Sequence, residues 1–180
     1  MKQIIYYVAA SLDGFIAGSN DDVSNFIYEG DGIKKYIEDL QSFKTVIMGK
    51  RTYEFGYKFG AIAGQPSPAY PHMKHYIFAN DLKFENKSEM VEVKNIDIEE
   101  IKKIKNTSET DIYLCGGGIF AGWLLDNREI DILKIKLNPV MLRSGISLFG
   151  NSQTKVKMEL IDSNIYEKGL QIMTYKIIYV

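Results

Sequence analysis

Apolar positions along the chain follow two recurring patterns, short continuous runs and longer segments with helical spacing. Residues 4–10 (IIYYVAA) form an uninterrupted run of β-branched, aromatic and small side chains, which predicts a strand buried on both faces. Apolar residues then recur at i, i+3, i+4 and i+7 as Ile33, Tyr36, Ile37 and Leu40, the spacing of one helix face. The chain therefore begins with a strand followed by an amphipathic helix.

The same two patterns continue to the end of the chain. Further strands are predicted at residues 45–48, 75–79, 91–93, 111–115 and 130–137, and helices at 52–55, 97–105 and 119–125. Asp97 and Glu100 have the spacing of a helix N-cap and its reciprocal glutamate. Two alternating strands at 156–164 and 170–179 predict a closing antiparallel hairpin. Strands that alternate with helices indicate an α/β fold with a mostly parallel sheet, and we expect one domain over residues 1–180.

Residues 60–72 contain three of the four prolines and predict a long surface loop rather than a domain boundary.

Ligands of parallel α/β sheets bind beyond the carboxyl ends of the strands. That rule selects residues 10–18, 49–53 and 116–120 as the segments to search for chemistry.

Gly49, Lys50, Arg51 and Thr52 follow a buried strand and open a helix. Helix N-terminal amides, a hydroxyl and cations together make a phosphate site, although a solvated turn with ordinary surface cations is the equal alternative. Residues 10–18 form either a lid over a reaction site or an inert surface loop.

Gly116, Gly117 and Gly118 lie between a strand and a helix, where backbone amides can approach a pyrophosphate. The turn lacks the full G-x-G-x-x-G fingerprint, and a tightly packed turn is the alternative. Two such candidate sites after two strands of one sheet favour a dinucleotide over a mononucleotide.

Composition narrows the classes of partner. The 180 residues carry a formal net charge of -1, which argues against nucleic acid and against an anionic membrane surface. Cys115 is the one cysteine, so an intrachain disulfide and a cysteine-rich metal site are excluded. The N-terminal apolar run is too short for a signal peptide or a membrane span, and we expect a cytoplasmic protein.

Other candidate residues have plain structural interpretations. His72 and His75 have no accompanying carboxylate cluster, and we expect no metal. Cys115 and Trp123 are interpreted as a buried small residue and a core or interface residue.

Four features in this order resemble the dihydrofolate reductase-like superfamily: AASLDGFIAG, VIMGKRTYE, CGGGIF and the terminal hairpin. Within it, SLDG, the glycine turn and the segment from Asn138 to Phe149 are most similar to the reductase domain of bifunctional riboflavin-biosynthesis enzymes, the RibD C-terminal domain. The resemblance covers nearly the whole chain. It implies a three-layer sandwich, with a central sheet flanked by helices.

The resemblance also implies site residues. Cofactor-binding positions would be Ala10, Ile16, Ala17, Gly49, Lys50, Arg51, Thr52, Asn80, Gly116, Gly117, Gly118 and Ile119, and the substrate-side positions Leu148 and Phe149. Family members often place a serine or arginine near the adenosine 2′-phosphate, whereas this chain has Ala79, Asn80 and Asp81 there. An aspartate would repel that phosphate, so selection of NADPH would rest on Lys50 and Arg51.

Two carboxylates are candidate catalytic acids. Asp31 is near the place where folate reductases carry their acid, but the surrounding pterin-binding context is absent and a helix N-cap is the alternative. Asp13 is near the expected nicotinamide, or caps a turn with Gly14.

The resemblance implies an NADPH-dependent oxidoreductase, with NADH as a second possibility, that transfers a hydride to a C=N or C=O bond of a pyrimidine- or pterin-like substrate. The favoured type is 5-amino-6-(5-phosphoribosylamino)uracil reductase of riboflavin biosynthesis. A dihydrofolate reductase and a non-catalytic nucleotide-binding protein with the same fold are the alternatives. We expect a homodimer.

Overall fold

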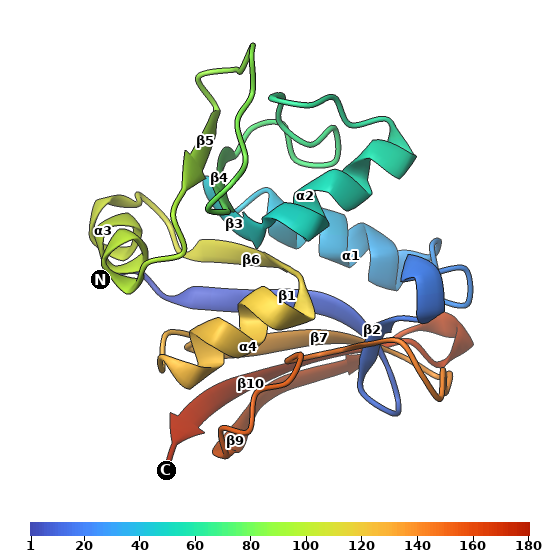
Figure 1. Ribbon diagram of the computed structural model, residues 1–180. Helices are drawn as coiled ribbons and strands as arrows, with labels where there is room; N and C mark the ends of the chain where they lie inside the picture. Colours follow the sequence, from blue (N-terminus) through green and yellow to red (C-terminus); the bar gives the residue numbers. More distant parts are fainter.

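The structure, a computed structural model that describes residues 1–180, is built on one eight-stranded sheet (Figure 1). Its strands are β1 (Ile4–Ser11), β3 (Thr45–Gly49), β4 (Lys74–Phe78), β5 (Val91–Lys94), β6 (Ile112–Gly116), β7 (Ile132–Asn138), β9 (Val156–Ile165) and β10 (Gln171–Tyr179). They lie in the order β5-β4-β3-β6-β1-β7-β10-β9. The strands from β5 to β7 in this order are parallel, and β10 is antiparallel to β7 and β9. The predicted parallel sheet with a closing antiparallel hairpin is confirmed.

Helices cover both faces of this sheet. They are α1 (Asp31–Leu40), α2 (Lys50–Phe55), α3 (Ile98–Thr107) and α4 (Gly118–Asp126). Ile101 of α3 and Leu124 of α4 belong to one hydrophobic cluster, whereas Leu40 of α1 and Tyr53 of α2 belong to another. Figure 1 shows α1 and α4 on opposite sides of the strands. The predicted three-layer α/β architecture is therefore confirmed.

β1 contributes side chains to both clusters. Ile4, Tyr6 and Ala10 point into one cluster and Tyr7 into the other, and each of them is 0% exposed. Alternate side chains of a strand point to opposite faces, so only a continuous apolar run satisfies both sides. The prediction of a strand buried on both faces is confirmed.

The buried face of α1 differs from the predicted one. Ile37 is 52% exposed, and the fully buried positions of the helix are Gly32 and Leu40. A Cβ at Gly32 would lie 2.6 Å from Leu170 Cδ2, so the missing side chain lets residues from the terminal hairpin pack against the helix. The prediction that Ile37 lies on the buried face was wrong. The spacing of apolar residues does not show that Gly32, which has no side chain, makes the close contact with the terminal hairpin.

The N-terminus of α3 begins as predicted, at Asp97. Its Oδ1 accepts a hydrogen bond of 3.0 Å from the Glu99 backbone N–H. The carboxylate of Glu100 does not return a bond to the cap, because it pairs with Lys94 at 3.1 Å and Lys103 at 2.7 Å. The cap is confirmed, and the reciprocal half of the capping box was wrong.

Two short strands form a second sheet that the hydrophobic pattern does not predict. β2 (Phe15–Ala17) pairs antiparallel with β8 (Ile146–Ser147). Each strand is too short to show an alternation in sequence. The pairing fixes the loop after β1 against the loop after β7.

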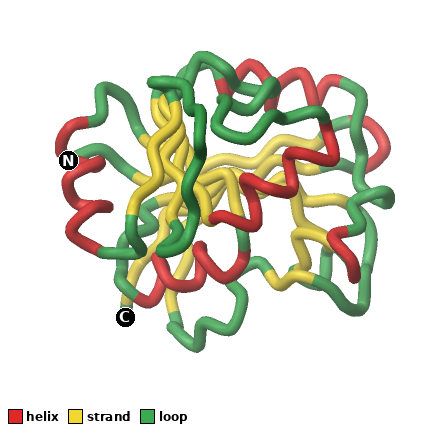
Figure 2. The backbone as a smooth tube through the Cα atoms, turned by 45° about the horizontal axis from the view of Figure 1, so that its top comes forward, coloured by secondary structure: helices red, strands yellow, loops and turns green.

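Residues 60–73 lack regular secondary structure, as their prolines predict (green in Figure 2). The Tyr53 hydroxyl donates a hydrogen bond of 2.6 Å to the Gln65 carbonyl, which ties this loop to α2. None of the helices is both long enough and apolar enough to cross a lipid bilayer.

Replacing Gly122 by alanine should destabilise the fold. An added Cβ would lie 2.2 Å from the Phe149 carbonyl oxygen, where α4 touches the chain after β8. We expect Gly122→Ala to lower the free energy of unfolding by about 1–3 kcal/mol in urea titrations. Ile119→Ala, on the same helix but 73% exposed, is the control and should change it by less than about 0.5 kcal/mol. Equal stability of both variants would contradict the close contact.

Candidate active site

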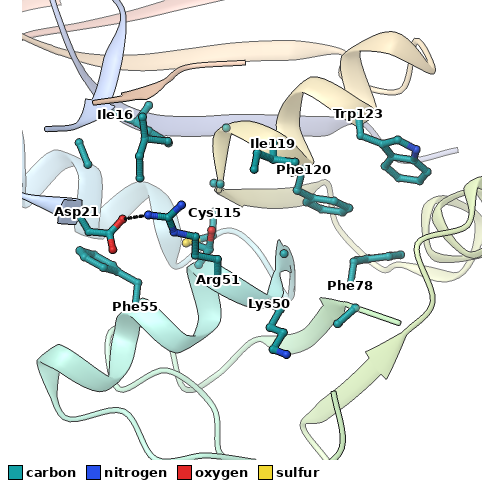
Figure 3. A pocket seen from close by; sticks show the side chains of 18 of the residues that line it. Ile16, Asp21, Lys50, Arg51, Phe55, Phe78, Cys115, Ile119, Phe120 and Trp123 are labelled. Atoms are coloured by element: carbon teal, nitrogen blue, oxygen red, sulfur yellow. Dashed lines mark hydrogen bonds and ion pairs between the residues drawn. The ribbon is translucent and has the colours of Figure 1, made fainter. Parts of the chain in front are cut away.

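A cavity of about 600 Å³ opens where β3, β4 and β6 end (Figure 3). Most of the predicted cofactor positions line it, namely Ile16, Ala17, Gly49, Lys50, Arg51, Thr52, Asn80, Gly116, Gly117, Gly118 and Ile119. Ala10 does not, because its side chain is fully buried in the core. The structure thus brings together segments that are far apart in the sequence, and their role in cofactor binding stays a prediction.

The two predicted substrate-side residues lie outside the cavity lining. Leu148 and Phe149 pack against the hydrophobic core. The Tyr6 hydroxyl donates a hydrogen bond of 3.0 Å to the Leu148 carbonyl, and the Phe149 ring meets Tyr6 edge-on at 5.6 Å. From this segment the cavity receives Ile146 instead.

The floor of the cavity is a split in the sheet between β1 and β6. β1 pairs with β7 from Ile5 to Ser11, but with β6 only from Ile4 to Tyr6. Beyond that point Val8 of β1 and Cys115 of β6 both line the cavity. The two central strands of the sheet therefore separate at their carboxyl ends and leave a gap.

Glycines at the end of β6 allow this separation. Gly116 has φ +140° and Gly117 has φ +92°, and both values lie in a region that side chains disfavour. A Cβ at Gly117 would lie 2.5 Å from Thr52 Oγ1, so the glycine turn and the start of α2 approach each other closely.

Gly118 allows the start of α4 to pack closely against the backbone of β8. A Cβ there would lie 2.0 Å from the Ser147 carbonyl oxygen. The interpretation of a tightly packed turn therefore fits Gly118, whereas Gly116 and Gly117 shape the cavity.

Both cations of the cavity already face carboxylates. Lys50 Nζ lies 3.1 Å from Asp81 Oδ2. An Arg51 guanidinium nitrogen lies 2.8 Å from Asp21 Oδ1 (dashed line in Figure 3). Asp21 was not a sequence candidate. It follows Asn20 in a short 3-10 turn, and both residues have φ 59°, a left-handed conformation that is uncommon for residues other than glycine.

Aromatic side chains form one wall of the cavity. The Phe78 and Phe120 rings are stacked at 4.9 Å, and the Phe120 and Trp123 rings at 5.8 Å. All three line the cavity, so the interpretation of Trp123 as a core or interface residue missed its exposure to this space. Phe78 ends β4, and the rule of ligand binding beyond strand ends could have identified it.

Asp13 holds a loop in place. Its carboxylate accepts hydrogen bonds from Ser11 Oγ at 2.6 Å and from the backbone N–H groups of Leu142 and Arg143 at 3.1 and 2.8 Å. These bonds, that from Ser11 foremost, lower the pKa of Asp13 to about 2. Asp13 does not line the cavity and is ionised at neutral pH, so its placement does not favour a role as proton donor.

Asp31 lies at the start of α1, away from the cavity. Its side chain is 73% exposed and pairs with Lys34 at 2.7 Å. The N-cap residue of the helix is Gly30, so the alternative interpretation of Asp31 as the cap was wrong. The backbone N–H of Asp31 donates to the Glu167 side chain, which closes this end of the helix.

Cys115 and His75 are structural in their contacts. Cys115 Sγ lies 3.0 Å from the Tyr70 hydroxyl, and burial raises the pKa of the thiol, which stays protonated at neutral pH. His75 Nε2 accepts from the Ser67 N–H at 3.0 Å and Nδ1 lies 2.9 Å from the Met73 carbonyl. Burial lowers the pKa of His75 to about 4, so the ring is neutral.

No group of three or more His, Cys, Asp and Glu side chains gathers in a metal-binding arrangement.

Residues 2–172 match the family model of the RibD C-terminal domain. The chain belongs to this family. The members are reductase domains, so the RibD C-terminal match places the chain among oxidoreductases.

Solved structures support the same fold. A candidate riboflavin biosynthesis protein from Shewanella sp. PV-4 superposes with a TM-score of 0.81 at 19% identity, over 98% of this chain and 99% of that one. A diaminohydroxyphosphoribosylaminopyrimidine deaminase/5-amino-6-(5-phosphoribosylamino)uracil reductase from Thermotoga maritima gives 0.73 at 14% identity, over 98% of this chain and 56% of that one. Dihydrofolate reductase from Enterococcus faecalis, solved with NADP(H), gives 0.65 at 16% identity, over 98% and 95%. The dihydrofolate reductase-like fold is thereby confirmed.

Replacing Asp13 by asparagine should loosen the loop at Leu142 and Arg143. An amide has one acceptor oxygen where the carboxylate has two, so at least one backbone bond is lost. We expect faster hydrogen exchange at these two amides in Asp13→Asn. Wild-type protein should show the same loosening as the pH falls from about 4 toward 2, because the folded pKa of about 2 lies below the ordinary value of 3.8. Unchanged exchange together with lost turnover would instead assign Asp13 a catalytic role.

Proposed function

We propose that the chain is a reductase that uses NADPH, or NADH, to transfer a hydride to a C=N or C=O bond of a pyrimidine- or pterin-like substrate. The most specific form of the proposal is a 5-amino-6-(5-phosphoribosylamino)uracil reductase of riboflavin biosynthesis. The observation that carries it is the gap between β1 and β6, which opens into a cavity flanked by two glycine turns. Family membership and the reductase named for the Thermotoga maritima protein support the substrate class.

The residues present fit a dinucleotide. Any side chain at Gly117 would fill the space between the glycine turn and Thr52, and both residues line the cavity. The adjoining gap has apolar walls from Val8, Ile16 and Ala17. Backbone amides at the two turns would hold the phosphates, and the apolar gap would take the flat nicotinamide ring.

A reduced nicotinamide dinucleotide supplies a hydride when bound. The chain itself positions the reactants and excludes water from them. Ile16 and Ala17 belong to β2, whose pairing with β8 holds them over the gap, where apolar side chains exclude water. The Cys115 thiol at the floor of the cavity stays neutral, so it places no negative charge beside the bound ring.

Thr52→Ala should weaken dinucleotide binding. Loss of one hydrogen bond from the phosphate-facing turn costs about 0.5–1.5 kcal/mol, or about 2- to 12-fold in Kd. Fluorescence titration with NADPH and NADH measures this loss. Thr107→Ala, a hydroxyl of α3 that bonds only the Lys103 carbonyl, is the matched control and should bind as wild type.

The same protein is then assayed for NADPH and NADH oxidation with aminouracil and dihydropterin substrates. Turnover of an aminouracil supports the specific proposal, and turnover of dihydrofolate alone would replace it with a folate reductase. Binding without turnover on any substrate favours the non-catalytic nucleotide-binding alternative. Failure to bind either dinucleotide would overturn all three.

We also propose that two copies form a homodimer through β9. This edge strand is exposed over nearly its whole length, and Met158, Leu160, Ile161 and Ile165 are 42–78% exposed. A long open edge strand that carries exposed apolar side chains invites pairing with another strand, which a second copy would provide.

Ile161→Lys should convert the dimer to a monomer, because a charge on the buried pairing surface disfavours association. Light scattering coupled to size-exclusion chromatography measures the mass. Ile62→Lys, at a residue that is 67% exposed in the loop after α2, is the control and should remain dimeric. A monomeric wild-type protein would contradict the proposal.

A further inference from the structure

The charged side chains that line the cavity cancel one another. They are two cations, Lys50 and Arg51, and two carboxylates, Asp21 and Asp81. Arg51 is held by Asp21, which also lies 3.8 Å from Lys58. Lys50 is held by Asp81, and this hydrogen bond raises the pKa of Lys50. No cation of the lining is left without a carboxylate partner to receive an additional phosphate.

Asp81 follows β4, which β3 and β6 separate from the gap between β6 and β1. In the sheet order β4-β3-β6-β1, the gap comes last and the end of β4 comes first. The two glycine turns follow β3 and β6, between these points. A dinucleotide with its nicotinamide in the gap and its phosphates at the turns therefore extends its adenosine toward Asp81.

The backbone around Asp81 is anchored. Asn80 Oδ1 accepts a hydrogen bond of 3.1 Å from the Ile96 N–H, which ties the turn after β4 to the segment before α3. Asn80, Asp81 and Ile96 all line the cavity. The Asp81 side chain is 77% exposed and so remains available to a ligand at the rim.

We propose that Asp81 sets the choice of dinucleotide: its carboxylate accepts a hydrogen bond from the adenosine 2′-hydroxyl of NADH and repels the 2′-phosphate of NADPH. The chain then binds NADH at least as tightly as NADPH. An acidic side chain that bonds the ribose 2′-hydroxyl is the device by which many α/β dinucleotide folds select NAD over NADP. This inference rests on the proposed function, because it takes the cavity to be a dinucleotide site.

The test measures Kd for NADPH and NADH with wild-type protein and Asp81→Asn. The substitution removes the repulsion and releases Lys50, so the Kd for NADPH should fall about fivefold or more. The Kd for NADH should stay the same or rise, because an amide oxygen accepts a weaker hydrogen bond from the 2′-hydroxyl than a carboxylate does. Glu85→Gln removes one negative charge from an exposed residue outside the cavity and is the charge-matched control. Its two Kd values should equal those of wild type.

Three results would overturn the inference. One is a wild-type preference for NADPH of more than about threefold, and another is an Asp81→Asn variant whose ratio of the two Kd values equals that of wild type. The third is an equal gain of NADPH affinity in Glu85→Gln, which would assign the effect to net charge. The first two leave the proposed function standing, since both cofactors still bind. Wild-type protein that binds neither dinucleotide overturns the inference and the proposed function together.

Discussion

The separation of β1 from β6 is the constraint on which the rest of the structure depends. Three residues of each strand pair, from Ile4 to Tyr6 and from Ile112 to Leu114, and then the ladder ends while β1 continues along β7. Gly116, the last residue of β6, and Gly117, just after it, have positive φ values that a residue with a side chain would resist. This split forms the floor of the cavity at the carboxyl ends of the strands.

The shape of the cavity also depends on contacts between segments that are far apart in the chain. Gly118 and Gly122 let α4 rest against the backbone near Ser147 and Phe149. Asp13 fixes the preceding segment through the N–H groups of Leu142 and Arg143. These contacts hold the loops that follow β1 and β7 together, and β2 and β8 pair as a result. Residues without a direct place in the cavity thus determine its shape.

Positive and negative side chains balance in the cavity lining, as they nearly do in the whole chain. The formal net charge is -1, and the four charged side chains of the cavity lining sum to zero. In the sequence, Lys50 and Arg51 are two cations that a phosphate could use. The structure pairs them with Asp81 and Asp21, which lie 31 and 30 residues away in the chain. The family match and the solved structures establish family and fold, whereas these pairings follow from the contacts of the residues themselves.

The sequence by itself determined the order and type of the main elements, because burial on one or both faces of a strand or helix leaves a periodic pattern. The apolar run of β1 and the cap at Asp97 are examples. It also located most of the cavity wall, since strand ends and glycine turns can be identified locally. The exposure of Ile37, the ion pair of Asp21 and Arg51, and the engagement of Asp13 with the loop at Leu142 could not be read in the same way. Each depends on a contact between segments distant in the chain, and only the tertiary structure decides which side chains and backbone groups meet.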